Sequence, residues 1–161
     1  MACGNMIKKK ISELAQSLGI EMFGFSKNSF VALFPYYVSG EVGNISMYAR
    51  GRDYHKVVKA MLLPVNGKFE EFGAEDVIIH CDNGEYDDRR AAYEAGLGFF
   101  GRNNMLINDK YGSYFFIGQV IHNLDIEPDR PLKNSCLNCG KCIESSAESR
   151  AIQIDDVIVD L

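Results

Sequence analysis

Three closely spaced cysteines have the clearest chemical signature in this sequence. They are Cys136, Cys139 and Cys142, in the segment CLNCGKCIESSAES. The C-x2-C-x2-C spacing lets three thiolates on one tight loop reach three iron atoms of a [4Fe-4S] cluster, and Gly140 lets the backbone fold closely. Zinc is the alternative, although tetrahedral cysteine sites usually pair two separated C-x2-C units. Three unrelated thiols are the remaining explanation, which this spacing disfavours.

The run lacks the fourth cysteine of the pattern C-x2-C-x2-C-x3-C-P. Ser146 and Ala147 stand where that pattern has cysteine and proline. In two-cluster ferredoxins the fourth cysteine of such a run ligates the other cluster. We therefore expect a shortened two-cluster module with at most one incomplete site. Cys3 or Cys81 could supply a fourth ligand only if the fold brings it close.

Composition narrows the class of protein. The chain has 161 residues, 47% of them apolar, and a net charge of −5. That charge argues against general attraction to nucleic acid or to an anionic membrane. No segment approaches the ~18 apolar residues of a spanning helix. Clustered cysteines in odd number indicate a reducing compartment, and an amphipathic segment follows Lys8–Lys10 instead of a signal peptide's apolar stretch. We expect a cytoplasmic protein with no membrane association.

The elements that must position this chemistry follow from hydrophobic periodicity and turn residues. Helical spacing covers residues 6–18, and Asp53 begins a second helix that we expect to end at Pro64. A third helix is expected at 85–96. Strands are expected at 21–26, 30–37, 76–81 and 113–124, and Pro35 suggests that the second is an edge strand or is bent. Residues 82–84 form a turn and 126–134 a connector. The fold class is α+β, an α/β sandwich at 1–132 followed by a cysteine-bearing segment at 133–161.

Three segments together resemble the epoxyqueuosine reductase family. They are YARGRDYH at 48–55 with GNIS just before it, the stretch from Asp82 to Gly98 continued by FFGRNNMLIN, and YGSYFFIG before the cysteine run. They cover most of residues 43–145 in the same order and spacing. The family consists of cobalamin-dependent iron–sulfur enzymes that perform the last step of queuosine synthesis in tRNA. Reductive dehalogenases and cobalamin-processing proteins share the related fold, so the resemblance implies a nitroreductase-like cobalamin-binding domain with a truncated ferredoxin-like tail.

The resemblance also implies roles for individual residues. Asp82 would be the proton donor, and a carboxyl at the end of a buried strand can be desolvated and hold a proton near neutrality. The alternative is a simple turn residue. The expected cofactor-binding residues are Tyr48, Arg50, Asp53, Tyr54, His55, Arg102, Asn103, Leu106, Ser113 and Ile117. Without the resemblance, YARGRDYH is a helix start with Asp53 as its N-cap. The segment SYFFIG is expected to be core first and corrin floor second.

The implied activity is reductive removal of the epoxide oxygen of epoxyqueuosine in tRNA. Electrons from an external donor would pass through the clusters to the cobalt, and Asp82 would protonate the departing oxygen. The net negative charge argues against tRNA binding, because proteins that bind tRNA usually have a basic surface. Two alternatives stay open: a non-catalytic cobalamin-binding module, and a small iron–sulfur or zinc protein whose α/β part is scaffold.

Overall fold

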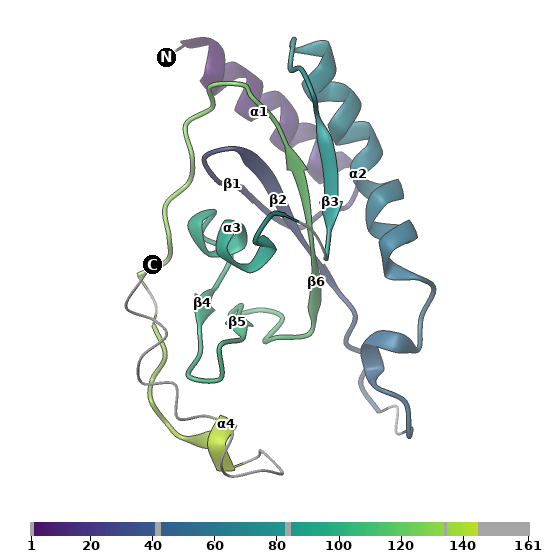
Figure 1. Cartoon of the computed structure of the whole chain (residues 1–161), viewed down its shortest axis with the longest axis vertical. Coiled ribbons are helices and arrows are strands. Elements are labelled where there is room, and N and C mark those ends of the chain that lie inside the picture. Colours follow the sequence, from purple (N-terminus) through teal and green to yellow (C-terminus); the bar gives the residue numbers. More distant parts are fainter. Residues whose placement is uncertain (1, 41–42, 83–84, 134, 145–161) are drawn as a thin grey trace.

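A four-stranded antiparallel sheet organises the chain (Figure 1). The computed structural model describes residues 2–40, 43–82, 85–133 and 135–144. The strand order is β1-β2-β6-β3, which makes β2 and β6 the two inner strands. The strands are β1 (Met22–Phe25), β2 (Ser29–Pro35), β3 (Ile78–Cys81) and β6 (Phe115–Ile121).

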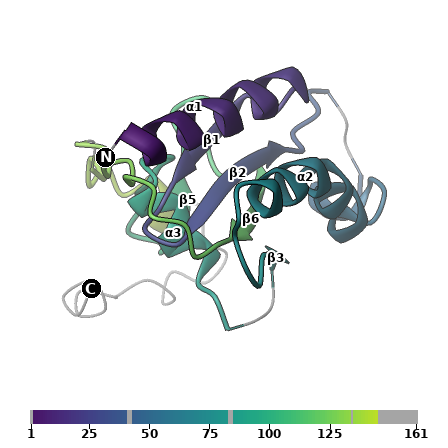
Figure 2. The same cartoon turned by 90° about the horizontal axis from the view of Figure 1, so that it is seen from above.

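Helices cover both faces of this sheet (Figure 2). On one face, α1 (Ala2–Ser17) and α2 (Tyr54–Glu71) pack over Phe30, Ala32 and Val120. On the other face, α3 (Asp88–Glu94) packs over Val31 and Leu33 of β2. Alternate residues of β2 thus enter different cores, as a sheet buried on both faces requires. The expected α+β layered fold is confirmed at this level.

The segment after β6 packs against the free edge of β1. The Asp129 carboxylate accepts a hydrogen bond from the Phe25 amide at 2.8 Å, and the Asp129 amide donates to the Phe25 carbonyl at 2.8 Å. Lys8 from α1 forms an ion pair with the same carboxylate at 2.7 Å. Covering an edge strand in this way removes a row of backbone groups that could pair with another chain. The connector that we expected at 126–134 is therefore packed against β1 and α1 through Asp129.

The lower end of the sheet carries the irregular elements (Figure 1). A two-stranded hairpin of β4 (Phe99–Phe100) and β5 (Leu106–Ile107), which we did not anticipate, precedes β6. A 3-10 turn, η1 (Met47–Ala49), precedes α2, and α4 (Lys141–Glu144) lies in the cysteine-bearing segment. None of the described helices combines the length and apolar character that crossing a membrane requires.

Two expectations based on proline were wrong. Helix α2 does not end at Pro64 but continues to Glu71, because Val65 and Phe69 extend the buried stripe that contains Val58 and Leu62. The burial of that stripe outweighs the local cost of proline in a helix. Strand β2 is not an edge strand, since it pairs with β1 on one side and with β6 on the other, and Pro35 is its last residue. The alternative expectation, a bend at Pro35, stays a prediction.

Candidate functional site

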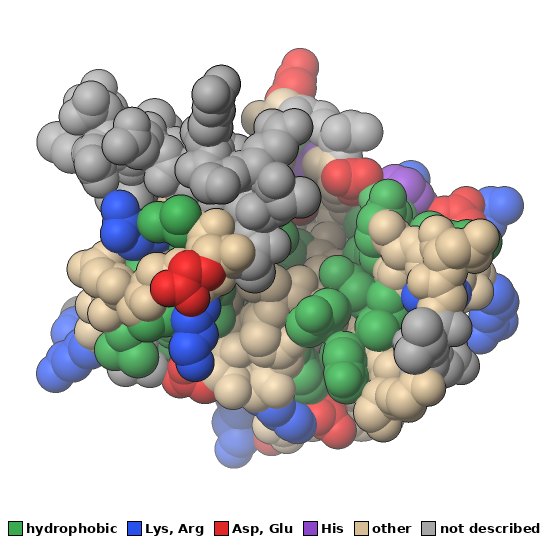
Figure 3. Space-filling view, turned by 90° about the horizontal axis from the view of Figure 1, so that it is seen from below, with side chains coloured by type: hydrophobic (Ala, Val, Ile, Leu, Met, Phe, Trp, Pro, Cys, Tyr) green, Lys and Arg blue, Asp and Glu red, His purple; other side chains and the backbone are tan. Residues whose placement is uncertain are grey.

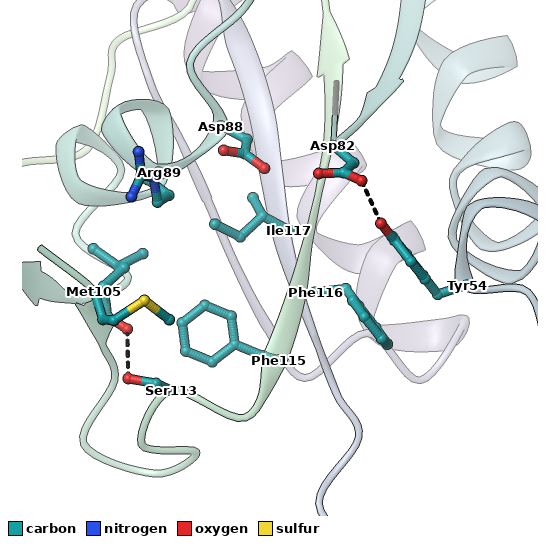
Figure 4. A pocket seen from close by; sticks show the side chains of 10 residues that line it. Tyr54, Asp82, Asp88, Arg89, Met105, Ser113, Phe115, Phe116 and Ile117 are labelled. Atoms are coloured by element: carbon teal, nitrogen blue, oxygen red, sulfur yellow. Dashed lines mark hydrogen bonds between the residues drawn. The ribbon is translucent and has the colours of Figure 1, made fainter. Parts of the chain in front are cut away.

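A cleft of about 160 Å³ opens at the junction of β3, β6, α2 and α3 (Figure 4). Its lining combines an apolar floor with charged groups at one edge. The lining residues are Tyr54, Asp82, Asp88, Arg89, Met105, Leu106, Ser113, Phe115, Phe116 and Ile117. Among the predicted residues, the cleft brings together Tyr54, Asp82, Leu106, Ser113 and Ile117.

Aromatic and aliphatic side chains of β6 form the floor. Tyr54, the first residue of α2, lies parallel to Phe116 with ring centroids 4.1 Å apart. Ile117 lies on the opposite side of the strand, within the core under α3. At the open end, the Ser113 hydroxyl donates to the Leu106 carbonyl at 3.0 Å and thereby holds the β5–β6 turn. The expectation that SYFFIG is core first agrees with this placement, and its second role as a corrin floor stays a prediction.

Asp82 is the residue directly after β3, and it is held from two sides. The Tyr54 hydroxyl donates to Asp82 Oδ2 (Figure 4), and the His55 Nε2 atom lies 3.4 Å from the same oxygen. Asp53, the N-cap of α2, accepts from the His55 amide and contacts His55 Nδ1, both at 3.1 Å. Burial, and then the bond to Asp82, raise the pKa of Tyr54, so the phenol keeps its proton and acts as the donor. The polar side chains at the start of α2 thus contact one another and together position the carboxyl of Asp82.

The backbone of Asp82 adopts a left-handed conformation, with φ of 73°. This region is uncommon outside glycine, although Asp and Asn tolerate it better than other residues. The side chain is 45% exposed, so the desolvation that we expected at the end of a buried strand is not found. The reason is that β3 is an edge strand whose buried end residue, Cys81, packs into the α1–α2 core. Of the expected turn, Asn83 and Gly84 lie outside the described residues.

Asp88 is a second carboxyl of the cleft, and sequence reasoning missed it. It is the first residue of α3, and Figure 4 shows its side chain directed toward the cleft near Asp82. Burial raises the pKa of Asp88, while the Arg89 amide and the nearby His80 oppose that effect. In the sequence Asp88 looks like its neighbour Asp87, which instead caps α3 by accepting from the Arg90 amide. Which of these two carboxyls is directed toward the cleft depends on the residue at which α3 begins.

Six predicted cofactor residues lie outside the cleft lining. Asp53 contacts His55, which reaches the cleft through Asp82, and the remaining four are Tyr48, Arg50, Arg102 and Asn103. Tyr48 is exposed on η1. The Arg50 side chain donates to the carbonyls of Ile45 at 2.7 Å and Gly43 at 3.3 Å, which closes the loop before η1. Asn103 accepts from the Met105 amide at 3.3 Å within the β4–β5 turn. These contacts are structural, and a cofactor role for the four residues stays a prediction.

The cysteine run does not form a preassembled site. Across the described ranges, no group of three or more His, Cys, Asp or Glu side chains is arranged to hold a metal ion. Cys136 and Cys139 precede α4 and Cys142 lies within it. A cluster at these cysteines therefore stays a prediction from their spacing. Cys81 is buried in the core, and that burial raises the pKa of its thiol to about 11, while its role as a fourth ligand stays a prediction. The Cys3 side chain and Ser146 lie outside the described residues.

The cleft opens onto a face rich in hydrophobic side chains (Figure 3). Exposed apolar residues from the lower end of the molecule include Tyr37, Val38, Met105 and Tyr114. A cleft of about 160 Å³ is smaller than the ~300–1,000 Å³ of sites that enclose a ligand. A corrin could therefore not be enclosed by these residues. An open apolar floor with a carboxyl at its edge does fit one side of a flat, largely apolar ring.

Comparison with known proteins agrees with this architecture. The family model described as "Epoxyqueuosine reductase QueG, DUF1730" matches residues 33–82, which run from β2 to Asp82. An epoxyqueuosine reductase of Francisella cf. novicida is 39% identical over 110 residues, covering 66% of this chain and 30% of the relative. One from Synechocystis is 35% identical over 119 residues, covering 73% and 40%. The chain belongs to the epoxyqueuosine reductase family. It spans about a third of the length of these curated relatives.

Solved structures show the same fold. The epoxyqueuosine reductase of Streptococcus thermophilus superposes with a TM-score of 0.72 at 23% identity, over 85% of this chain and 51% of that one. Two others each give 0.70 at 22% identity, covering 87% and 51%. One is a complex with an epoxyqueuosine-modified tRNA-Tyr stem loop. The other, from Bacillus subtilis, has its catalytic aspartate loop swung out of the active site. A reductive dehalogenase studied for B12-dependent dehalogenation gives 0.59 at 19% identity, covering 73% and 19%.

Proposed function

We propose that this chain forms the acid-bearing half of a cobalamin-dependent epoxyqueuosine reductase site, in which Asp82 protonates the departing epoxide oxygen. The observation that carries the proposal is the placement of one carboxyl, held by Tyr54 and His55, at the edge of an open apolar cleft. Family membership supplies the reaction, and the catalytic aspartate loop of the Bacillus subtilis relative supports an aspartate in this role. Asp82 begins the segment between β3 and α3.

The contacts of Asp82 favour the function of an acid over that of a turn residue. Both contacts involve Oδ2, and no described residue bonds Oδ1, which leaves that oxygen to carry and donate the proton. The Tyr54 hydroxyl and the Asp53–His55 pair fix the orientation of the carboxyl. A ligand lying on the floor would cover the exposed part of Asp82 and so provide the desolvation that strengthens its hold on a proton.

Cobalamin fits as the group on the apolar floor. When bound, it would supply a reduced and strongly nucleophilic cobalt. The residues that would hold the ring are Phe115, Phe116 and Ile117 beneath it and Leu106 at its side. Phe115 and Ile117 on one face of β6, and Phe116 on the other, present apolar side chains that exclude water from the region that Asp82 faces. B12 dependence in the structurally similar reductive dehalogenase is consistent with this assignment.

The proposed substrate is the modified nucleoside in a tRNA stem loop, as bound by one of the solved relatives. The net charge of −5 gives this chain little general attraction for a phosphate backbone. We therefore place recognition at the modified base itself. The [4Fe-4S] cluster, the segment division at residue 132, the external electron donor and the cytoplasmic location remain part of the proposal, supported by the cysteine spacing and by the family.

The test is an anaerobic titration of the purified chain with cobalamin, followed by incubation with a chemical reductant and an epoxyqueuosine stem loop. Visible spectroscopy reports corrin binding, and mass spectrometry of digested RNA reports queuosine. We expect binding and conversion in the wild type, and binding without conversion in Asp82→Asn. Corrin binding without conversion in the wild type would instead support a non-catalytic cobalamin-binding module. Absence of corrin binding would overturn the proposal.

A further inference from the structure

Two exposed tyrosines beside the cleft have no assigned role. Tyr37, two residues after β2, and Tyr114, directly before β6, are 57% and 47% exposed. Their rings pack against each other with centroids 5.1 Å apart and planes tilted by 59°. We call these two residues the tyrosine pair. Exposed aromatic rings that support each other are typical of binding surfaces, because a ligand buries apolar area on rings whose orientation is already fixed.

The tyrosine pair is continuous with the cleft. In the chain, Tyr114 lies between Ser113 and Phe115, which both line the cleft. The Tyr36 ring contacts the Tyr114 ring at a centroid distance of 6.0 Å and the Phe116 ring at 4.7 Å. Phe116 is itself a cleft residue. Contacting aromatic rings therefore connect the floor of the cleft to the tyrosine pair, and Tyr36 is the ring that joins them.

Backbone hydrogen bonds hold the tyrosine pair in place without a ligand. The Tyr36 amide donates to the Tyr114 carbonyl at 3.0 Å and so extends the β2–β6 ladder beyond Pro35. In the turn before β6, the backbones of Asn108 and Gly112 exchange two hydrogen bonds of 2.8 Å. A ligand that stacks on an ordered surface has little conformational entropy of the protein to overcome.

The hollow beside the tyrosine pair favours a flat, uncharged ligand. It has a volume of about 570 Å³ and is lined by Pro35, Tyr37, Lys110, Tyr111, Gly112 and Tyr114. Lys110 is the charged member of this described lining, and it forms an ion pair with Glu21 at 2.6 Å. The Tyr111 hydroxyl donates to the same carboxylate at 3.1 Å. Because Glu21 compensates the ammonium charge, the hollow offers aromatic faces to a ligand and little attraction for a phosphate.

We propose that the tyrosine pair binds an unpaired nucleobase that flanks the modified nucleoside in the RNA loop. This inference rests on the proposed function, which places the modified base in the cleft. Every nucleobase has a π face, so stacking on aromatic side chains requires neither a particular sequence nor a basic surface. With a net charge of −5, the chain would gain from stacking the affinity for RNA that general electrostatic attraction does not provide. The tyrosine pair thereby selects an RNA loop over the free nucleoside.

Fluorescence of 2-aminopurine tests the stacking directly, because this base analogue loses emission when it stacks on an aromatic ring. Two epoxyqueuosine stem loops carry the analogue, one on the 5′ side and one on the 3′ side of the modified nucleoside. Each is titrated with the cobalamin-loaded chain without reductant. We expect the wild type and Tyr37→Phe to quench at least one probe, and Tyr37→Leu to raise the dissociation constant about fivefold or more. Wild type that quenches neither probe would overturn the inference.

Tyr86→Leu is the matched control for Tyr37→Leu. Tyr86 is 40% exposed and lines a different cavity, between the β1–β2 turn and α3. The control variant removes the same kind of ring from another part of the surface and should leave the dissociation constants of both RNAs unchanged. Equal losses of affinity in the two leucine variants would overturn the inference, because they would show that the position of the ring does not matter.

Steady-state kinetics separate this inference from the proposed function. In Tyr37→Leu we expect the KM for the stem loop to rise about fivefold or more with kcat unchanged, because the lost contact lies outside the reacting centre. Cobalamin binding and conversion of the free epoxyqueuosine nucleoside should match the wild type. Weakened cobalamin binding would instead assign the tyrosine pair to the corrin and overturn the inference.

The wild type decides which of the two proposals has failed. Wild-type protein that binds no cobalamin and converts neither substrate would overturn the proposed function itself. An active wild type whose KM for the stem loop is matched by that of Tyr37→Leu would overturn the inference alone.

Discussion

Tyr54 lies parallel to Phe116, with ring planes only 1° apart, and its hydroxyl reaches across to Asp82. One residue at the start of α2 therefore contributes to the floor of the cleft and also orients the carboxyl at its edge. The stacked rings determine where the hydroxyl points, so the acid is positioned by packing as well as by a hydrogen bond.

Tyr54→Phe separates these two contributions. The stacked ring is retained while the bond to Asp82 is lost, so we expect the free energy of unfolding to fall by only about 0.5–1 kcal/mol. Epoxyqueuosine reduction should fall roughly tenfold or more, because the carboxyl loses its orientation. Denaturant unfolding and single-turnover assays measure the two effects. A variant with full activity would show that Tyr54 serves only the floor.

Asp82→Asn tests the acid with little effect on the fold. Asparagine tolerates the left-handed backbone that Asp82 adopts, and its side-chain oxygen can still accept from Tyr54. We expect activity to fall by about 10²–10⁴, with stability changed by no more than about 0.5 kcal/mol. Asp82→Ala should be less stable than Asp82→Asn, since alanine is strained at this φ. Retained activity in the asparagine variant would assign proton donation elsewhere.

Gly118 sets the distance between α2 and the sheet. A Cβ atom at this position would lie 2.5 Å from Val58 Cγ1 and 2.8 Å from Leu62 Cδ1, both in the buried stripe of α2. We expect Gly118→Ala to reduce the free energy of unfolding by about 1–3 kcal/mol through overpacking. It should also weaken activity, because Tyr54 is one turn before Val58.

Gly67 provides the matched control on the same helix. No atom lies within 4 Å of a Cβ built there, so Gly67→Ala should stabilise the chain by about 0.5–1 kcal/mol through helix propensity. Thermal unfolding of both variants measures the contrast. Equal effects at the two positions would contradict a role for Gly118 in helix–sheet spacing.

The sequence was informative where a local pattern determines local structure. Largely apolar runs in FVALFPYY and SYFFIGQVIHNL predicted the strands that the structure has as β2 and β6, and Asp53 is the N-cap of α2 as anticipated. The sequence was misleading where burial in the tertiary structure determines how far an element extends. Helix α2 continues past Pro64 because Val65 and Phe69 are buried. Local helix propensity predicts little where the burial of such side chains contributes more free energy.

The candidate site shows the same division. Tyr54, His55 and Asp82 could be named because their segments resemble a family, and the structure brings them together. Asp88 could not be distinguished from Asp87, because the difference lies in which residue begins the helix. The buried pairing of His80 with Gln119 depends on strand register between β3 and β6, which single-sequence patterns do not specify.

His122 makes a testable contribution to the dependence of stability on pH. It is 5% exposed and stacked on Phe69 at 4.4 Å, and burial lowers its pKa from 6.5 to about 4. Above pH ~6.5 the imidazole is neutral in both states and has no effect. As the pH falls from 6.5 to about 4 the unfolded chain binds a proton that the folded chain resists, so stability is progressively lost, by about 3 kcal/mol in all.

His122→Phe isolates this contribution, because it retains a ring against Phe69 and cannot titrate. Other groups also titrate in this range, and Asp88, whose folded pKa is raised, acts in the opposite direction by favouring the folded state as the pH falls. The informative quantity is therefore the difference in free energy of unfolding between wild type and variant, measured by urea denaturation at pH 7, 5.5 and 4.5. We expect the free energy of unfolding of the variant, relative to that of the wild type, to increase by about 1 kcal/mol or more for each pH unit below 6. A difference that stays constant with pH would mean that the folded protein accommodates a protonated His122, and hence that the region between α2 and β6 opens more readily than its packing implies.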